Sequence, residues 1–402
     1  MSDLLKIWFT EYKKIFSDGG TIMLFIIAII IYPVLYSLAY SNELVKDVPI
    51  AVVDNNHSNM SRLLTRMLDA SDEVNVKYKM SDFNAAKTKF DEGEIYGIIH
   101  IPDDFNKRIL KSESAHVSVY ADASYMVIYK QILTSANYTI GTMSAGIEIQ
   151  RRISKGQALD VAYYERDPLP LETYSLFNPN GGYATYAMPA VLLLVLQQTL
   201  LLGIGLLGGT AKEFGKEHYL LPIGLKKGGT IPIIIGKTLA YFSLYIINTL
   251  FVLVIIFRIF NLPMRSGYFE MFIFLTPFLL SVIFMGMTIA SLFKHRESSM
   301  MILLFTSIPF IFLSGFSWPI DSMPTWIQYL STVIPSTPGI KGFLALTQKG
   351  ASFNDVFMEW QHLWILTIIY FGSTVILLKT ILRRAQKTIN INTKNSNKLL
   401  NS

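Results

Sequence analysis

The chain has 402 residues, of which 51% are hydrophobic and only 16% are charged, and its formal net charge is +6. This composition is far from that of an average soluble domain and indicates a membrane protein. The sequence contains no cysteine, which excludes disulfide bonds and thiolate metal sites.

Residues 1–20 begin with an amphipathic pattern. At helical spacing the apolar side chains fall on one face, and polar side chains, Glu11 among them, fall on the other. Because an apolar run follows directly, we expect an interfacial helix that lies on the membrane surface, although a soluble amphipathic helix has the same pattern. The apolar face comprises Leu5, Trp8, Phe9, Tyr12, Ile15 and Phe16.

Six apolar stretches are long enough, or nearly so, to cross a bilayer. Their middles contain no Asp, Glu, Lys or Arg. Ser37 and Ala39 in the first stretch would suit signal-peptide cleavage, but the length of that stretch and the segment before it favour an uncleaved span. The six stretches are 21–41, 184–207, 231–257, 269–293, 299–316 and 362–382.

The distribution of Lys and Arg predicts the orientation of these spans. If both termini and the loops 208–230 and 294–298 share one side, that side and its adjoining span ends carry 16 basic and 6 acidic residues, a net charge of +10. The remaining residues then sum to −4, because the whole chain has +6. We therefore expect both termini in the cytoplasm and residues 42–183 outside the cell membrane.

Residues 42–183 alternate between strand and helix patterns and predict a small extracytoplasmic α/β domain. The fold class expected for the whole chain is an α-helical polytopic membrane protein with six transmembrane helices and this domain inserted between the first and second spans. The expected strands are 49–54, 75–79, 96–102 and 116–122. The expected helices are 58–70, 82–93, 103–111 and one long helix over 124–155.

Residues 184–382 form the expected five-helix transmembrane domain, and the polar residues 383–402 form a cytoplasmic tail that we expect to be disordered. The loop 208–230 contains a short helix that could receive force from a soluble partner, and a simple solvated connector is the alternative. The candidate contact residues in this loop are Glu213, Phe214, Glu217, His218, Leu221 and Pro222.

A proline- and tryptophan-rich stretch between the fifth and sixth spans, 314–345, predicts a short aromatic helix. Trp326 suits the boundary between membrane and water, and irregular backbone at membrane depth is tolerated where protein or a wet cavity surrounds it. We expect a re-entrant hairpin that forms an outer gate, with a plain loop on the lipid surface as the alternative. The candidate gate residues are Pro319, Met323, Pro324, Trp326 and Pro335.

The polar side chains in the middle of the spans are neutral, which argues against self-contained ion coupling. Gln197, Gln198 and Asn248 are candidates to line a transport pathway, and hydrogen bonding between helices is the alternative role. Gly205 and Gly209 form a GxxxG pattern that either permits close helix packing or ends a helix.

The chain shows no catalytic, metal-binding or nucleotide-binding pattern. Gly236-Lys237-Thr238 is similar to the end of a phosphate-binding loop, but Ile231 occupies the position that such a loop requires to be glycine. We therefore interpret this segment as the entry to a span, with the Lys237 side chain extending to the membrane surface.

The order of these motifs along the chain resembles the membrane subunit of ABC-2 type exporters. The shared features are an acidic–Gly–acidic loop helix followed by Leu-Leu-Pro, a Gly-Lys span entry, and Pro-rich blocks after the fifth span. The loop differs at Lys216, His218 and Ile223, where that family often carries Arg and Thr. The matching residues are Glu213, Gly215, Glu217, Leu220, Leu221, Pro222, Gly236, Lys237, Gly315, Pro319, Met323, Pro324, Trp326, Pro335, Thr337 and Asn178-Pro179-Asn180.

The resemblance implies the permease subunit of an ATP-driven exporter in a bacterial inner membrane, which pairs with a second permease copy or a sibling. A separate ATP-binding subunit would bind residues 211–224 and drive export of a drug, lipid or small compound. The implied further partners are membrane lipids, a periplasmic adaptor and an outer-membrane channel. No cofactor, metal or nucleic acid is implied, and the chain itself is expected not to be an enzyme.

Two other classes of protein remain open. A membrane-anchored receptor or adaptor would use the outer domain for binding, but it would need neither a charged loop helix nor a proline-rich hairpin. A secondary carrier would need an ion-coupling group, which the neutral spans do not provide.

Overall fold

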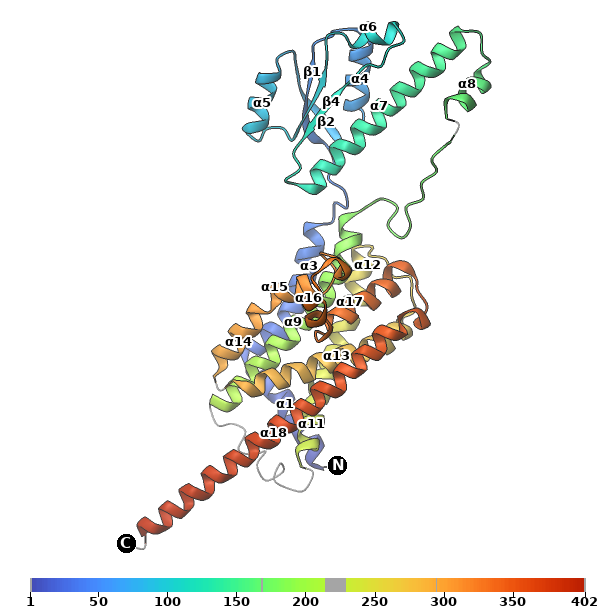
Figure 1. Cartoon of the computed structure of the whole chain (residues 1–402). Helices are drawn as coiled ribbons and strands as arrows, with labels where there is room; N and C mark the ends of the chain where they lie inside the picture. The colour runs from blue at the N-terminus through green and yellow to red at the C-terminus, as the bar shows by residue number, and fades with distance from the viewer. Residues whose placement is uncertain (1, 168, 214–228, 294, 401–402) are drawn as a thin grey trace. The chain divides into compact units, whose positions relative to one another are not determined.

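The structure is a computed structural model that describes residues 2–167, 169–213, 229–293 and 295–400. The chain divides into two compact units, one made of residues 1–43 and 175–402 and the other of residues 44–174 (Figure 1). The first unit is helical, and the second contains the sheet.

Within its described residues, the helical unit has six stretches that are long and apolar enough to cross a membrane, the number predicted from the sequence. The second of these stretches is the most enclosed, since 83% of its apolar window is buried, against 17% for the fifth and 22% for the sixth. The second span therefore forms the centre of the unit. The stretches are Gly19–Ala39, Tyr183–Thr210, Thr230–Ile259, Tyr268–Leu292, Arg296–Leu313 and Phe353–Arg383.

Several of these spans contain more than one helical element. The first and third include π-helical turns, and the fifth is divided into two α-helices by a turn at Thr306. In chain order the elements of this unit are α1 (Ser2–Ser17), α2 (Gly19–Ile22), η1 (Met23–Ile27), α3 (Ala28–Ala39), α9 (Tyr183–Glu213), α11 (Thr230–Leu250), η3 (Phe251–Ile256), α12 (Phe257–Ile259), α13 (Tyr268–Leu292), α14 (Arg296–Phe305), α15 (Ser307–Leu313), η4 (Ile320–Ser322), α16 (Thr325–Thr332), α17 (Ser336–Leu344), η5 (Ala345–Lys349), η6 (Phe353–Val356) and α18 (Phe357–Leu400).

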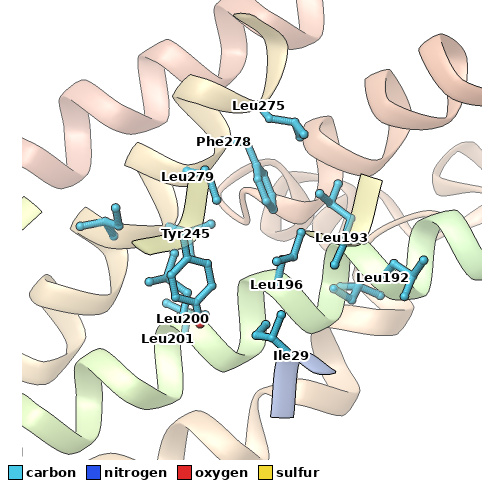
Figure 2. Close-up of a cluster of buried hydrophobic side chains, with 14 of the residues drawn as sticks. Ile29, Leu192, Leu193, Leu196, Leu200, Leu201, Tyr245, Leu275, Phe278 and Leu279 are labelled. Carbon is cyan, nitrogen blue, oxygen red and sulfur yellow. The ribbon is translucent and has the colours of Figure 1, made fainter. Parts of the chain in front are cut away.

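The core of the helical unit forms where α9 packs against α11 and α13. Leucines of α9 surround the rings of Tyr245 and Phe278, both fully buried (Figure 2). The Tyr245 hydroxyl donates to Thr199 Oγ1 at 3.0 Å, so its polar end is satisfied inside the apolar cluster. These contacts fix the position of the second span relative to the third and fourth.

The glycines of the GxxxG pattern bring α9 and α14 into close contact. A Cβ atom at Gly205 would lie 2.4 Å from Leu303 Cδ1, and one at Gly209 would lie 2.6 Å from the Cα of Arg296. Since α9 continues to Glu213, these glycines do not end the helix. The close-packing alternative is therefore confirmed, and the second and fifth spans meet along this glycine face.

The other unit is a four-stranded sheet with helices on both faces, and it falls in the sequence between the first two candidate spans. The strand order is β2-β1-β3-β4, in which the first three strands are parallel and β4 is antiparallel to β3. In chain order the elements are β1 (Val48–Asp54), α4 (Asn59–Asp69), β2 (Val74–Met80), α5 (Phe83–Asp91), β3 (Gly97–Ile101), α6 (Phe105–Leu110), β4 (Ser118–Ala121), α7 (Met126–Ser154) and α8 (Leu159–Arg166).

Alternate side chains of β1 enter two separate apolar clusters. Ile50 and Val52 pack with α4 and α7 on one face of the sheet, whereas Ala51 and Val53 pack with α5 on the other. This alternation is the two-residue period of a β-strand buried on both sides.

The structure differs from the sequence expectations at the C-terminal tail. Residues 383–402 were expected to be disordered, but α18 continues to Leu400. The long apolar part of α18 provides an existing helix onto which each later residue adds one hydrogen bond, so the polar sequence needs no nucleation step of its own. The short helix α8 was also not expected.

Candidate functional site

Only the first of the candidate loop residues falls in the described part of the chain. Glu213 is the last residue of α9, and one of its carboxylate oxygens accepts the backbone N–H of Arg296 at 3.2 Å. The contact joins the end of the second span to the start of the fifth. Phe214, Glu217, His218, Leu221 and Pro222 lie outside the described residues, so their role stays a prediction.

Arg296 is the centre of a polar cluster where three helices end or begin. Its guanidinium forms a bidentate pair with Asp18, with distances of 2.7 Å to Oδ2 and 3.2 Å to Oδ1. The same guanidinium donates to Thr210 Oγ1 at 3.3 Å. We call Asp18, Thr210, Glu213 and Arg296 the Arg296 cluster. It bonds the starts of the first and fifth spans to the end of the second.

The geometry of the Arg296 cluster depends on glycine and on a helix cap. A Cβ at Gly20 would lie 2.8 Å from the Nη2 atom of Arg296, so the guanidinium lies against bare backbone. Asp18 caps α2 by accepting the Thr21 N–H at 2.9 Å. Burial raises the pKa of Asp18, but the hydrogen bonds from Arg296 and Thr21 outweigh it and lower that pKa below the usual value, so the carboxylate is charged at neutral pH.

A second polar group joins the N-terminal helix to the third span. Glu11 is only 1% exposed, and its Oε1 accepts the Tyr241 hydroxyl at 2.5 Å and lies 3.9 Å from Lys237 Nζ. The expectation that Glu11 lies on an exposed polar face is therefore wrong. The buried stripe is Ile7, Glu11 and Ile15, because α11 packs on this side of α1 and its polar groups bind one oxygen of the carboxylate.

The expectation for Lys237 is also corrected. Its side chain is 12% exposed and is directed to the carboxylate of Glu11 instead of extending freely to the membrane surface. Gly236 lies beside it, where a Cβ would come within 2.9 Å of Ile7 Cγ2. The Gly-Lys pair thus provides a close contact and a countercharge for α1.

The three candidate pathway residues all donate hydrogen bonds to neighbouring helices. Gln197 Nε2 donates to Ser336 Oγ at 3.2 Å, and Gln198 Nε2 donates to the Leu303 carbonyl at 2.5 Å. Asn248 Nδ2 donates to the Phe25 carbonyl, in the π-helical turn of the first span, at 2.9 Å. Their contacts are those of helix packing, and the pathway role stays a prediction.

The predicted gate region contains a short exposed helix followed by a buried one. Pro324 precedes α16, on which Trp326 is 69% exposed. Pro335 precedes α17, where Ser336 is fully buried and Phe343 is 1% exposed. Pro319 precedes the short turn η4, and Met323 follows that turn.

Backbone carbonyls at the junction of α16 and α17 are satisfied by side chains of the last span. Tyr370 donates its hydroxyl to the Val333 carbonyl at 2.6 Å, and His362 Nε2 lies 2.8 Å from the Thr332 carbonyl oxygen. Thr337 Oγ1 donates to the Leu313 carbonyl at 3.1 Å. Irregular backbone is thus bonded within the helical unit, as membrane depth would require.

Sequence reasoning did not find the Arg296 cluster or the burial of Glu11. One signal was present, since Asp18 directly precedes the first span, Arg296 begins the fifth, and the two residues have opposite charge. Charged residues at span edges are common, however, and these two meet only because α2 and α14 both pack against α9.

A bundle of six long apolar helices, with buried polar contacts that join their ends, defines a multi-pass membrane protein. The profile of the family described as "ABC-2 family transporter protein" matches residues 20–376. The chain therefore belongs to the ABC-2 transporter family, and it is a transport permease.

Known relatives agree with this assignment. The chain is 22% identical over 367 residues to the probable multidrug ABC transporter permease YbhR of Escherichia coli K12, which covers 89% of this chain and 92% of that protein. It is 24% identical over 254 residues to the permease YbhS of the same strain, covering 62% and 63% of the two chains. It is also 21% identical over 345 residues to the inner membrane transport permease YhhJ, covering 82% and 84%.

Proposed function

We propose that this chain is the membrane subunit of an ATP-driven exporter of the bacterial inner membrane. A separate ATP-binding subunit binds the 211–224 segment, and two permeases form the pathway, either two copies or this chain and a sibling. Both termini are cytoplasmic, and residues 42–183 are extracytoplasmic. Small amphipathic compounds are the proposed cargo, because relatives are named multidrug permeases.

The contacts of the Arg296 cluster are the observation that supports this proposal. The 211–224 segment begins at the end of α9, where Glu213 accepts the Arg296 N–H, and Arg296 in turn binds Asp18. A force applied to the segment would reach the first, second and fifth spans together, because these bonds join them at one place. This arrangement suits a subunit that receives its power stroke from a neighbour.

The fifth span supports the pairing of two permeases. Its apolar window is only 17% buried, and Met301, Phe305 and Ile308 are more than half exposed. The polar residues Thr306 and Ser307 interrupt this exposed face at the turn between α14 and α15. We propose that this face contacts the second permease beside the pathway. The proposed periplasmic adaptor and outer-membrane channel bind the extracytoplasmic domain.

Disruption of the coupling segment is expected to release the ATP-binding subunit. Leu221→Asp places a charge at a proposed apolar contact, so the amount of ATP-binding subunit that co-purifies in mild detergent should fall about tenfold or more. Mass spectrometry identifies the co-purified subunit, and ATP hydrolysis confirms that it is active. Leu110→Asp, at a 77% exposed position in the sheet-containing unit, is the matched control.

Equal recovery of the ATP-binding subunit with Leu221→Asp and wild type would reject this interface. If the pure wild-type chain alone accumulated cargo in liposomes on an ion gradient, the chain would be a secondary carrier. A wild-type protein that recruits no ATP-binding subunit but binds a ligand through residues 42–183 would instead be a receptor.

The gate proposal predicts a separate effect at Trp326. Trp326→Asp should reduce export of fluorescent dyes from cells by about tenfold, because an aspartate is costly where the indole would sit at the membrane boundary. Co-purification of the ATP-binding subunit should be unchanged. Trp326→Phe, which keeps an aromatic ring, should export normally, and normal export by Trp326→Asp would remove the gate from the mechanism.

A further inference from the structure

The sheet-containing unit has a cavity at the carboxyl ends of its first two strands that the transport proposal does not use. The cavity has a volume of about 540 Å³ and is open to solvent. Its walls come from the ends of β1 and β2, the turn after β1, and the first two turns of α4. This volume is within the range of small-molecule sites, which is roughly 300–1,000 Å³.

The chain topology explains why a crevice opens at this place. The connection after β1 leads to α4 on one face of the sheet, while the connection after the neighbouring β2 leads to α5 on the other face. The two connections therefore diverge outside the carboxyl ends of adjacent parallel strands. Side chains from both connections can therefore reach this crevice.

Basic side chains line this crevice. Arg62 and Arg66 extend from successive turns of α4, Lys79 comes from the end of β2, and His57 comes from the turn before α4. Among the described residues Arg66 forms no ion pair, whereas Lys79 lies 3.6 Å from Asp69. The first turn of α4 contributes the positive end of a helix dipole on the same side.

The one acidic residue in the wall does not neutralise these groups. Both oxygens of Asp54 are used inside the turn, where Oδ1 accepts the N–H groups of Asn56 and His57 at 3.0 Å each. Its Oδ2 accepts the Ser61 hydroxyl at 2.7 Å. The carboxylate thus holds the turn in shape and pairs with neither arginine. Arg62 Nη2 donates to Asn59 Oδ1 at 2.8 Å, so the Arg62 guanidinium is held on α4 beside the crevice.

We propose that this crevice binds a phosphate group, carried either by a small soluble molecule or by a phospholipid headgroup. Two guanidinium groups match the several oxygens of a phosphate, and Lys79 adds a point charge. The Ser81 hydroxyl and the Asn59 amide, also in the wall, can donate hydrogen bonds to the rest of the ligand. The site is separate from the Arg296 cluster and does not depend on the proposed export function.

Binding of two probes to the full chain in detergent tests the proposal. The probes are glycerol phosphate, which is soluble, and a short-chain phosphatidylglycerol, which presents the same group on a lipid. Calorimetry should detect binding of at least one of them, weakened by added salt because the contacts are between charges. Binding of glycerol phosphate alone would identify a soluble ligand, and binding of the lipid alone would identify a headgroup; either result supports the site.

Charge-removing variants locate the binding. Arg66→Gln and Lys79→Gln should each weaken binding about tenfold, since each removes one charge-assisted contact. Lys87→Gln makes the same change at an exposed position of α5, on the opposite face of the sheet, and should bind like wild type. Unchanged melting temperatures would show that the variants are folded. The proposal is overturned if wild type binds neither probe, or if Arg66→Gln and Lys79→Gln both bind as tightly as wild type.

Discussion

Arg296→Glu is expected to uncouple ATP hydrolysis from export and to lower the melting temperature. The substitution removes both hydrogen bonds to Asp18 and places a second carboxylate next to it. The Asp18 and Arg296 side chains are 18% and 33% exposed, so the loss should fall between the values for exposed and buried pairs, roughly 2 kcal/mol. The ratio of dye exported to ATP hydrolysed, measured in proteoliposomes with the ATP-binding subunit, should fall at least tenfold.

Two further variants distinguish the loss of the Asp18–Arg296 ion pair from other effects of substituting Arg296. Arg296→Lys keeps the charge but loses the bidentate fork, and should give an intermediate ratio. The exchange Asp18→Lys with Arg296→Glu should recover part of the lost function, although it also removes the cap of α2. Lys349→Glu, at an exposed position far along the chain from the Arg296 cluster, should change neither measurement. Normal coupling in Arg296→Glu would show that the cluster has no part in force transfer.

The elements of this fold were predictable where local pattern decides the structure. The runs of apolar residues in the spans and in β1 are set by burial, and six apolar helices with a small sheet are present in the described residues. Sheet order and the placement of helices on the two faces were not predicted. They depend on which strands pair, and pairing is decided by contacts between residues far apart in the sequence.

The candidate site was less predictable, because its geometry comes from helix packing. Glu11 shows the difficulty, since its charge predicts exposure but α11 supplies Tyr241 and Lys237 to bind it. Residue type alone cannot show that a partner from another helix will satisfy a buried charge. The sequence identifies Gln197 and Asn248 as polar residues in the middle of apolar spans. Their hydrogen-bond partners, Ser336 and the Phe25 carbonyl, can be identified only in the three-dimensional structure.

Gly203→Ala is expected to destabilise the helical unit, although alanine normally favours a helix. A Cβ at Gly203 would lie 1.9 Å from Cε1 of Phe25, a fully buried ring. That ring packs edge-on against Tyr241 and Tyr245, with centroid distances of 6.0 and 5.5 Å, so it has little room to move. Overpacking of this kind costs about 1–3 kcal/mol, more than the gain of about 1 kcal/mol in helix propensity.

The melting temperature in detergent measures this effect, and Gly372→Ala is the control. Gly372 lies in α18, and a Cβ there would meet nothing within 4 Å, so the same substitution should be neutral or slightly stabilising. Phe25→Leu removes the ring edge and should make the double variant Gly203→Ala/Phe25→Leu more stable than the sum of the single effects. If the stability changes of Gly203→Ala and Phe25→Leu simply added, the new methyl group would not clash with the Phe25 ring. The close approach of the first and second spans would then not limit the residue at position 203.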